Sequence, residues 1–209
     1  GRGVTPYTAL VYGLGYGIPA PQVHREIIDA ARQSMMVRRD GIWLWAGGVV
    51  YADPPTHPAV MNVRYIPEEQ LPKGTRNFTP IKNHKTWGNR VQPLGSWRIT
   101  PATRTLIVLE GLFDMLITAQ KIHQLGREAD TVAVYTNGAS SSARMHQWFR
   151  EHPQYEYLLL RDPDKAGVEW AQSVSASIRH GCAKVRTLRP PDKLDPDEAI
   201  LSGWWPSIL

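Results

Sequence analysis

The second half of the chain alternates short apolar segments with segments of helical spacing, and this alternation constrains the fold more than any other feature. Apolar runs of four to six residues are typical of strands buried on both faces. Gly126 and Gly181 follow two of the helical segments as stop signals. Four strands joined by three helices predict an α/β fold with a mainly parallel sheet flanked by helices. The strands are expected at 105–109, 131–135, 155–160 and 184–188, and the helices at 112–125, 142–150 and 166–179.

The first 104 residues lack this alternation, and we expect them to form a smaller mixed α+β subdomain ahead of the sheet. Thr5 and Pro6 match an N-cap and a first helical position, so a short helix is expected before the glycines of 13–17. A second helix is expected to end at residue 35, and residues 37–100 are rich in strand and turn patterns. We interpret 13–17 as a turn because its glycine spacing matches no dinucleotide-binding or P-loop fingerprint.

Positive charge is concentrated in the first half of the chain. The formal net charge of +5 divides into +7 for residues 1–104 and −2 for residues 105–209. Residues 70–109 contain seven Lys or Arg side chains and no acidic one. A basic segment beside an acid-bearing one indicates a polyanion held next to a metal site, although a solvated positive face gives the same charge pattern. The residues expected to bind nucleic acid are Lys73, Arg76, Lys82, Lys85, Arg90 and Arg98.

Composition limits where the protein works and what it contains. Cys182 is the single cysteine, which excludes a disulfide framework and a multi-cysteine zinc site within these residues. It also fits a reducing compartment, so a cytoplasmic location is expected. No segment approaches the roughly 18 apolar residues of a membrane helix, and no membrane contact is expected. The chain begins with Gly1 rather than Met, which suggests a fragment of a longer protein.

Acidic residues follow three of the predicted strands. Because the carboxyl ends of parallel strands meet at one edge of a sheet, we expect these side chains to lie close together. Each close pair of carboxylates costs on the order of 1 kcal/mol even near solvent, so their convergence requires a cation. Oxygen ligands of this kind select Mg²⁺ or Mn²⁺. The acids at this edge are Glu110, Asp114, Asp162, Asp164, Asp195 and Asp197.

Two segments beside these acids are candidates for phosphate binding. The loop after the second strand contains Asn137 and Gly138 and is rich in hydroxyl groups. It either binds a phosphate or caps the next helix through Ser141 or Ser142.

The second candidate is the start of the helix that follows Asp164. Lys165 is followed there by two small residues, which would let a phosphate approach the main-chain N–H groups. Arg161 and Lys165 flank the acids, and they either contact a triphosphate or neutralise the neighbouring carboxylates.

The acidic segments resemble the TOPRIM domain, which is shared by bacterial-type DNA primases, topoisomerases, recombination mediators and a class of nucleases. The resemblance covers roughly residues 105–190. The chain is most similar to the bacterial-type, DnaG-like primases, whose later Asp-Pro-Asp is matched at 195–197, and residues 2–16 resemble the entry to their RNA-polymerase core. The two main matching segments are Leu106-Ile-Val-Leu-Glu110-Gly-Leu-Phe-Asp114 and Leu158-Leu-Leu-Arg-Asp162-Pro-Asp164-Lys-Ala-Gly167.

This resemblance implies that the two halves of the chain have different roles. Residues 1–104 would be the basic N-terminal subdomain of a primase-like RNA-polymerase core, and residues 105–209 the TOPRIM catalytic domain. Asp114, Asp162 and Asp164 would bind two Mg²⁺ or Mn²⁺ ions with substrate present, and Asp195 and Asp197 would extend the acidic edge. Glu110 would be either a metal ligand or the proton-transfer group.

The resemblance also implies partners and leaves alternatives open. The protein would make short RNA primers on a single-stranded DNA template from nucleoside triphosphates, with Phe78, Trp87 or Trp97 available for base stacking. A zinc-binding module and a replicative helicase or helicase module would lie outside these residues. The high Trp content suggests a divergent member from a phage, plasmid or other mobile element. The competing hypothesis is a TOPRIM nuclease; a topoisomerase fragment and a binding scaffold with a degenerate site are weaker ones.

Overall fold

The computed structural model describes residues 3–16, 48–53, 60–65, 85–88, 91–138, 142–181 and 183–206. Its contacts divide the chain into two units, one of residues 1–8 and 90–209 and one of residues 9–89. Every acidic residue proposed above as a metal ligand belongs to the larger unit. No helix among the described residues has the length and apolar character needed to cross a bilayer.

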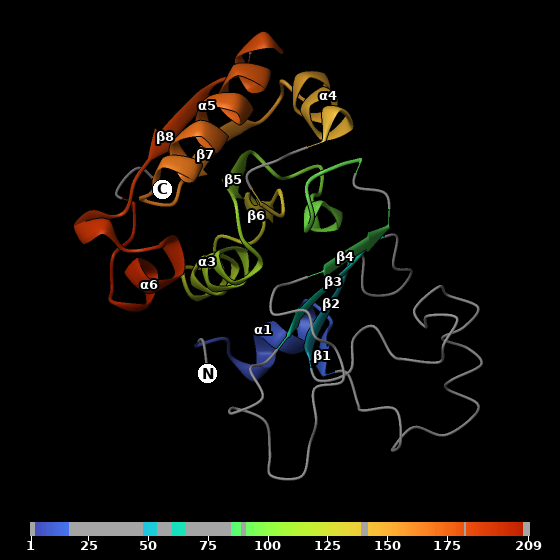
Figure 1. Cartoon of the computed structure of the whole chain (residues 1–209), viewed down its shortest axis with the longest axis vertical. Coiled ribbons are helices and arrows are strands. Elements are labelled where there is room, and N and C mark those ends of the chain that lie inside the picture. Colours follow the sequence, from blue (N-terminus) through green and yellow to red (C-terminus); the bar gives the residue numbers. More distant parts are fainter. Residues whose placement is uncertain are drawn as a thin grey trace. The chain divides into compact units, whose positions relative to one another are not determined.

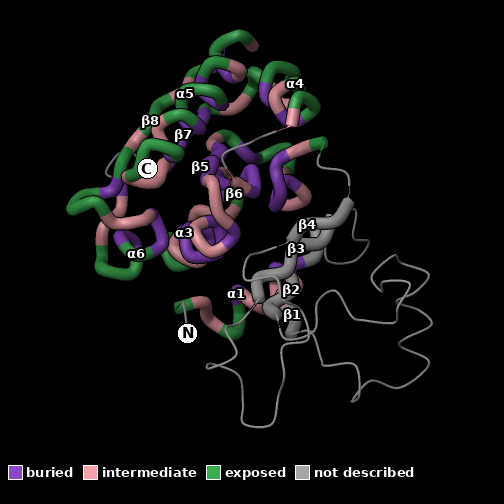
Figure 2. The backbone as a smooth tube through the Cα atoms, viewed as in Figure 1, coloured by how far each residue is buried: buried purple, intermediate pink, exposed green. Residues whose placement is uncertain are grey.

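The larger unit is built on a four-stranded sheet in the order β6-β5-β7-β8, in which every pair is parallel (Figure 1). All residues of β6 are buried, as are the last four of both β5 and β7 (Figure 2). Strands covered on both faces need near-continuous apolar sequence, which is the pattern that predicted them. The strands are β5 (Thr105–Leu109), β6 (Thr131–Tyr135), β7 (Glu156–Leu160) and β8 (Val185–Leu188).

Helices cover both faces of this sheet. One face is covered by α4 (Ala143–Glu151) and α5 (Lys165–His180), whose buried Phe149 and Trp170 join a core cluster with Val108 and Leu159. Helix α3 (Leu112–Gln124) contacts β5 and β6. Helix α6 (Pro196–Leu201) packs against α3, so these two helices lie together. The predicted strand and helix positions are confirmed to within one or two residues at each end.

The crossovers explain where a site can form. The chain moves from β5 to β6 in one direction along the sheet, and from β6 to β7 and then β8 in the other. Because crossovers between parallel strands are right-handed, helices on the two routes lie on opposite faces. The chain therefore leaves the adjacent strands β5 and β7 toward opposite faces, and ligands bind in the crevice beyond the carboxyl ends of such a strand pair.

Residues 91–104 also pack with the parallel sheet. Leu94 forms a two-way main-chain bridge with Tyr135, with both N–H···O distances at 2.9 Å, and Arg104 accepts a hydrogen bond from the Glu156 N–H. The short helix η3 (Ser96–Arg98) lies in this segment. The unit boundary near residue 90 therefore differs from the expected one at 104, because main-chain pairing extends the sheet unit beyond its first strand.

The first eight residues belong to the sheet unit as well. The Thr5 N–H donates to Gln120 Oε1 at 2.8 Å, and Gln120 Nε2 donates to the Gly3 carbonyl at 3.2 Å. The expected first helix is confirmed as α1 (Pro6–Val11), with the Thr5 hydroxyl accepting from the Thr8 N–H.

The smaller unit contains an antiparallel sheet in the order β1-β2-β3-β4. The interpretation of 13–17 as a turn was wrong for its middle, which forms β1. A glycine-rich segment has no side-chain pattern to mark it as a strand, and its pairing with β2 decides its conformation. The predicted second helix lies outside the described residues. The strands are β1 (Leu14–Tyr16), β2 (Gly48–Asp53), β3 (Val60–Tyr65) and β4 (Lys85–Gly88).

Candidate metal and nucleotide site

The candidate site lies beyond the carboxyl ends of β5 and β7. Glu110 directly follows β5, and Asp162 follows β7 after one residue. Asp114 lies in the first turn of α3, and Asp197 lies in the first turn of α6. The predicted convergence of acids is therefore found at the two central strands.

A hydrogen bond connects two of these segments. The Asp197 N–H donates to Asp114 Oδ1 at 3.1 Å, and Asp197 itself is 2% exposed. This contact holds the start of α6 against the start of α3, although 83 residues separate the two aspartates. The third acidic segment thereby reaches the strand ends through helix packing.

Burial and mutual repulsion raise the pKa values of the three central acids. Burial, followed by the charges of Asp197 and Asp162, raises the pKa of Asp114 to about 7, against a smaller lowering effect of the hydrogen bond from Asp197. Burial and the charges of Glu110 and Asp195 raise the pKa of Asp162 to about 7. Burial, then the charges of Asp164 and Asp114, raises the pKa of Glu110. The acids therefore lie close enough to destabilise one another's charged forms.

Two carboxylate oxygens in this group have no hydrogen-bond partner among the described residues. Glu110 Oε2 and Asp162 Oδ1 are both buried without a donor. Buried anionic oxygens without donors are costly, and a divalent cation satisfies them directly. Within the described part of the chain, no three His, Cys, Asp or Glu side chains are already arranged as a metal site. The donors fit Mg²⁺ or Mn²⁺ nonetheless, since Mg²⁺ takes only one or two carboxylates together with waters and substrate phosphates.

Two glycines permit the close approach of these segments. A Cβ at Gly111 would collide with Asp114 Oδ2, and a Cβ at Gly167 would lie 2.6 Å from the Asp162 carbonyl oxygen. A larger residue at either position would push an acidic side chain or its loop away from the crevice. Sequence reasoning used Gly111 only as part of a motif and Gly167 as a small residue that admits a phosphate, and it did not assign them this packing role.

Two of the predicted ligands are also helix caps. Asp164 is the N-cap of α5, and its Oδ1 accepts from the Gly167 N–H at 2.7 Å. Asp195 is the N-cap of α6 in a reciprocal capping box with Glu198. The expectation of open N–H groups in the first turn of α5 was wrong at Gly167, because a neighbouring carboxylate occupies that donor.

The loop after β6 lies beside Glu110. Asn137 is buried with a left-handed φ of 62°, and the Gly138 N–H donates to the Glu110 carbonyl at 3.0 Å. Ser142 caps α4 by accepting from the Met145 N–H at 3.2 Å, as one of the two alternatives expected. Phosphate binding by Asn137 and Gly138 stays a prediction.

The cations flanking Asp162 have other contacts. Arg161 Nη1 donates to the Asp162 carbonyl at 2.9 Å, and Arg161 also lines a cavity between α5 and β8. Lys165 is exposed and lies 3.6 Å from Glu169 one turn along α5. A triphosphate contact by either cation stays a prediction.

Only part of the predicted nucleic-acid-binding run is described. Arg98 pairs with Glu128 at 3.6 Å and lies 5.4 Å from the Trp97 ring centroid, so it has structural partners. Lys85 lies on β4, in the smaller unit. Lys73, Arg76, Lys82 and Arg90, and also Phe78, lie outside the described residues.

Comparison with known proteins supports the fold. Residues 107–200 match the protein-family model described as Toprim-like. The RNA polymerase domain of Mycobacterium tuberculosis primase DnaG is a similar solved structure, with a TM-score of 0.63 and 12% identity over 97% of this chain and 69% of that chain. The cobalamin-dependent S-adenosylmethionine radical enzyme OxsB matches at a TM-score of only 0.30 and 8% identity, over 88% of this chain and 28% of that one. No curated protein matches the chain.

The larger unit therefore has the TOPRIM fold predicted from the sequence, and the predicted resemblance to a TOPRIM, DnaG-like core is confirmed at the level of the fold.

Proposed function

We propose that this chain is the RNA-polymerase core of a DNA primase, which makes short RNA primers on single-stranded DNA from nucleoside triphosphates. One observation carries the proposal: the buried oxygens Glu110 Oε2 and Asp162 Oδ1, which have no hydrogen-bond donor, lie beyond the adjacent central strands of a TOPRIM fold. The likeness to a primase RNA polymerase domain extends over 97% of the chain, which favours a primase over other TOPRIM enzymes.

The residues proposed to hold the metal are those of the acidic edge. Glu110, Asp114 and Asp162 would be the inner ligands, and Asp164, Asp195 and Asp197 would add negative charge around them. When bound, two Mg²⁺ or Mn²⁺ ions would lower the pKa of the attacking ribose 3′-hydroxyl and stabilise the leaving pyrophosphate.

The chain's own contribution is positioning and proton transfer. The Asp197 N–H fixes Asp114 Oδ1, and Gly111 and Gly167 let the Asp114 carboxylate and the Asp162 loop enter the crevice. Burial raises the pKa of Glu110, so Glu110 holds a proton more readily than a solvated glutamate does. This shift suits Glu110 to proton transfer at the ribose hydroxyl, and metal ligation by the same carboxylate is the alternative role.

The remaining parts of the proposal concern partners. The basic residues Lys73, Arg76, Lys82, Lys85, Arg90 and Arg98 would hold the phosphates of the template and of its short hybrid. Arg161, Lys165, Asn137 and Gly138 would contact the incoming triphosphate. A zinc-binding module and a helicase or helicase module would act with the chain in the cytoplasm.

The test incubates the protein with single-stranded DNA, labelled nucleoside triphosphates and Mg²⁺ or Mn²⁺. Labelled oligoribonucleotides support the proposal, and a parallel reaction with a pre-annealed primer separates failure to initiate from failure to polymerise. Cleavage of the DNA without synthesis in either reaction identifies a TOPRIM nuclease and overturns the proposal.

Two matched variants assign the activity to the acidic edge. Asp162→Asn removes a charge beyond the carboxyl end of β7, and Glu156→Gln removes one at the amino end of the same strand. Glu156 is exposed and pairs with Lys184 at 3.0 Å. Synthesis is expected to fall on the order of 100-fold or more in Asp162→Asn and to stay unchanged in Glu156→Gln.

A further inference from the structure

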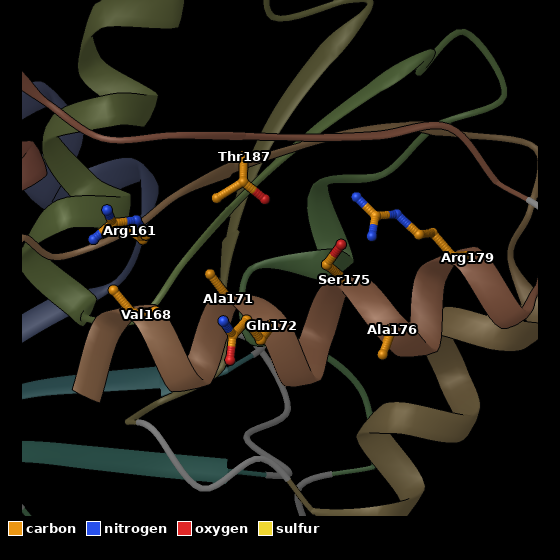
Figure 3. A pocket seen from close by; sticks show the side chains of 8 residues that line it. All are labelled: Arg161, Val168, Ala171, Gln172, Ser175, Ala176, Arg179 and Thr187. Atoms are coloured by element: carbon orange, nitrogen blue, oxygen red, sulfur yellow. The ribbon is translucent and has the colours of Figure 1, made fainter. Parts of the chain in front are cut away.

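A cavity of about 400 Å³ lies between α5 and β8, and Arg161 is the one lining residue to which the proposed function gives a role (Figure 3). Its volume falls within the range of small-molecule sites, which begins at about 300 Å³. The side chains that line it come from α5, from β8 and from the residue directly after β7. They are Arg161, Val168, Ala171, Gln172, Ser175, Ala176, Arg179 and Thr187.

The spacing along α5 creates the floor of this cavity. Val168, Ala171, Ser175 and Arg179 recur at intervals of three or four residues, so they form one stripe of the helix. β8 is an edge strand of the sheet, and its four residues pair only with β7 among the described strands. The small side chains of the stripe and the open edge of β8 leave the space that larger apolar residues would fill.

The polar lining carries positive charge and no acidic group. Arg161 and Arg179 lie at the two ends of the cavity, and the Arg179 side chain extends back over the stripe toward Ser175 (Figure 3). About 16 Å of helix axis separates Val168, beside Arg161, from Arg179. Two guanidinium groups without an acid in the lining favour an anionic ligand.

A buried hydroxyl in the middle of the cavity has no partner. Ser175 is 5% exposed, its Oγ has no hydrogen-bond partner in the described part of the chain, and it lines the cavity together with Thr187 (Figure 3). Buried polar side-chain atoms are nearly always hydrogen-bonded, so this atom indicates a ligand or water that completes the site. A hydroxyl between two arginines suits an oxygen-rich ligand with a charged end.

We propose that this cavity binds a nucleoside phosphate at a site beside the acidic edge, with Arg161 as the one lining residue that the proposed triphosphate contacts would share. A guanidinium binds phosphate oxygens through two parallel hydrogen bonds, and it also stacks on the face of a planar ring. One arginine would hold the phosphate, the other would cover the base, and Ser175 and Thr187 would contact the sugar or phosphate oxygens. Val168 and Ala171 give the apolar surface that the flat parts of such a ligand need.

The test measures ADP and GDP binding by isothermal titration calorimetry in EDTA. The chelator removes the divalent metal that nucleotide binding at the acidic edge would use, so the proposed primase activity and this site are measured independently. Saturable one-to-one binding is expected, at least about tenfold tighter than that of adenosine or inorganic phosphate, because neither has both halves of the ligand.

Variants of the lining assign the binding to the cavity. Arg179→Gln is expected to weaken ADP binding about tenfold, because one charge-assisted hydrogen bond is lost. Arg179→Lys is expected to recover only part of this, since an ammonium binds as a point charge. The matched control is Arg186→Gln, which removes a cation from β8 at the residue before Thr187. Neighbouring side chains of a strand point to opposite faces, and Arg186 is outside the lining. The Arg186→Gln variant should therefore bind ADP as tightly as the wild type.

Three results would overturn this proposal. The first is the absence of ADP and GDP binding to a folded protein in EDTA. The second is binding that Arg179→Gln leaves unchanged but Asp162→Asn abolishes, which would place the nucleotide at the acidic edge. The third is inorganic phosphate binding as tightly as ADP, which would identify an anion site with no nucleoside contact. None of these results depends on whether the protein makes primers.

Discussion

The main-chain N–H of Asp197 donates to Oδ1 of Asp114 at 3.1 Å and joins two acidic segments that are 83 residues apart. The hydrogen bond uses one oxygen of the Asp114 carboxylate, so the second oxygen is still available to bind a metal ion. It also explains how α6, which follows the last strand, contributes to a site at the two central strands. Four predictions follow from this and neighbouring contacts.

The stability of the metal-free protein should depend on pH through Asp114. Its pKa is about 7 in the folded chain against an ordinary value of 3.8, so the folded state binds the proton more tightly between these values. The free energy of unfolding therefore falls as the pH rises from about 4 to about 7. Asp114→Asn keeps an oxygen acceptor for the Asp197 N–H but cannot ionise. In EDTA it should unfold at a higher temperature than the wild type at pH 8 and at a similar one at pH 4; equal melting curves at pH 8 would refute the shift.

Divalent metal should stabilise the folded protein at neutral pH. At 100 times its dissociation constant, a bound ion adds about 2.7 kcal/mol to the free energy of unfolding. Protons compete for the same carboxylates, so the rise in melting temperature with Mn²⁺ should be larger at pH 7.5 than at pH 5. Thermal melts with Mn²⁺ and with EDTA at both pH values measure this rise in melting temperature. Glu156→Gln should keep the response and Asp162→Asn should lose most of it; an undiminished response in Asp162→Asn would place the ion elsewhere.

Gly167→Ala should lower both stability and metal binding. The new Cβ would lie 2.6 Å from the Asp162 carbonyl oxygen, so α5 and the Asp162 loop must separate. Overpacking of this kind costs about 1–3 kcal/mol. Chemical denaturation gives the stability, and Mn²⁺ titration gives the affinity. Ser173→Ala changes an exposed position of α5 and should stay within about 0.5 kcal/mol of the wild type. Wild-type values for Gly167→Ala would show that the loop has room to move.

Trp170 and Thr136 should be energetically coupled. Trp170 Nε1 donates to Thr136 Oγ1 at 2.8 Å in a buried position, which ties α5 to the residue after β6. Thr136→Val leaves the buried Trp170 Nε1 without its acceptor, at a cost of about 1–3 kcal/mol. Trp170→Phe removes that donor, while Thr136 Oγ1 keeps its hydrogen bond to the Gly138 carbonyl at 3.3 Å. The double variant loses both partners, so its destabilisation should be smaller than the sum of the two single effects. Strict additivity in urea denaturation would mean that the hydrogen bond contributes little.

The parallel sheet and the acids that follow its strands can be predicted from sequence patterns. Runs such as 105–109 are apolar without interruption because both faces of their strands are buried, and this pattern depends only on local sequence. The order of strands and the acids that follow them predicted which side chains meet, since parallel strands end at one edge. The positions of Glu110 and Asp162 therefore needed no knowledge of packing.

The environment of each side chain at that edge depends on contacts between elements that are distant in the sequence. The link from Asp197 to Asp114 depends on how α6 packs against α3. The raised pKa values of Asp114 and Asp162 depend on burial and on distances between distant segments. The cavity beside Ser175 arises where a helix stripe meets an edge strand, and no pattern along one segment encodes such a gap. Local sequence specifies an element and its buried face, whereas contacts between elements set the electrostatics and the empty space.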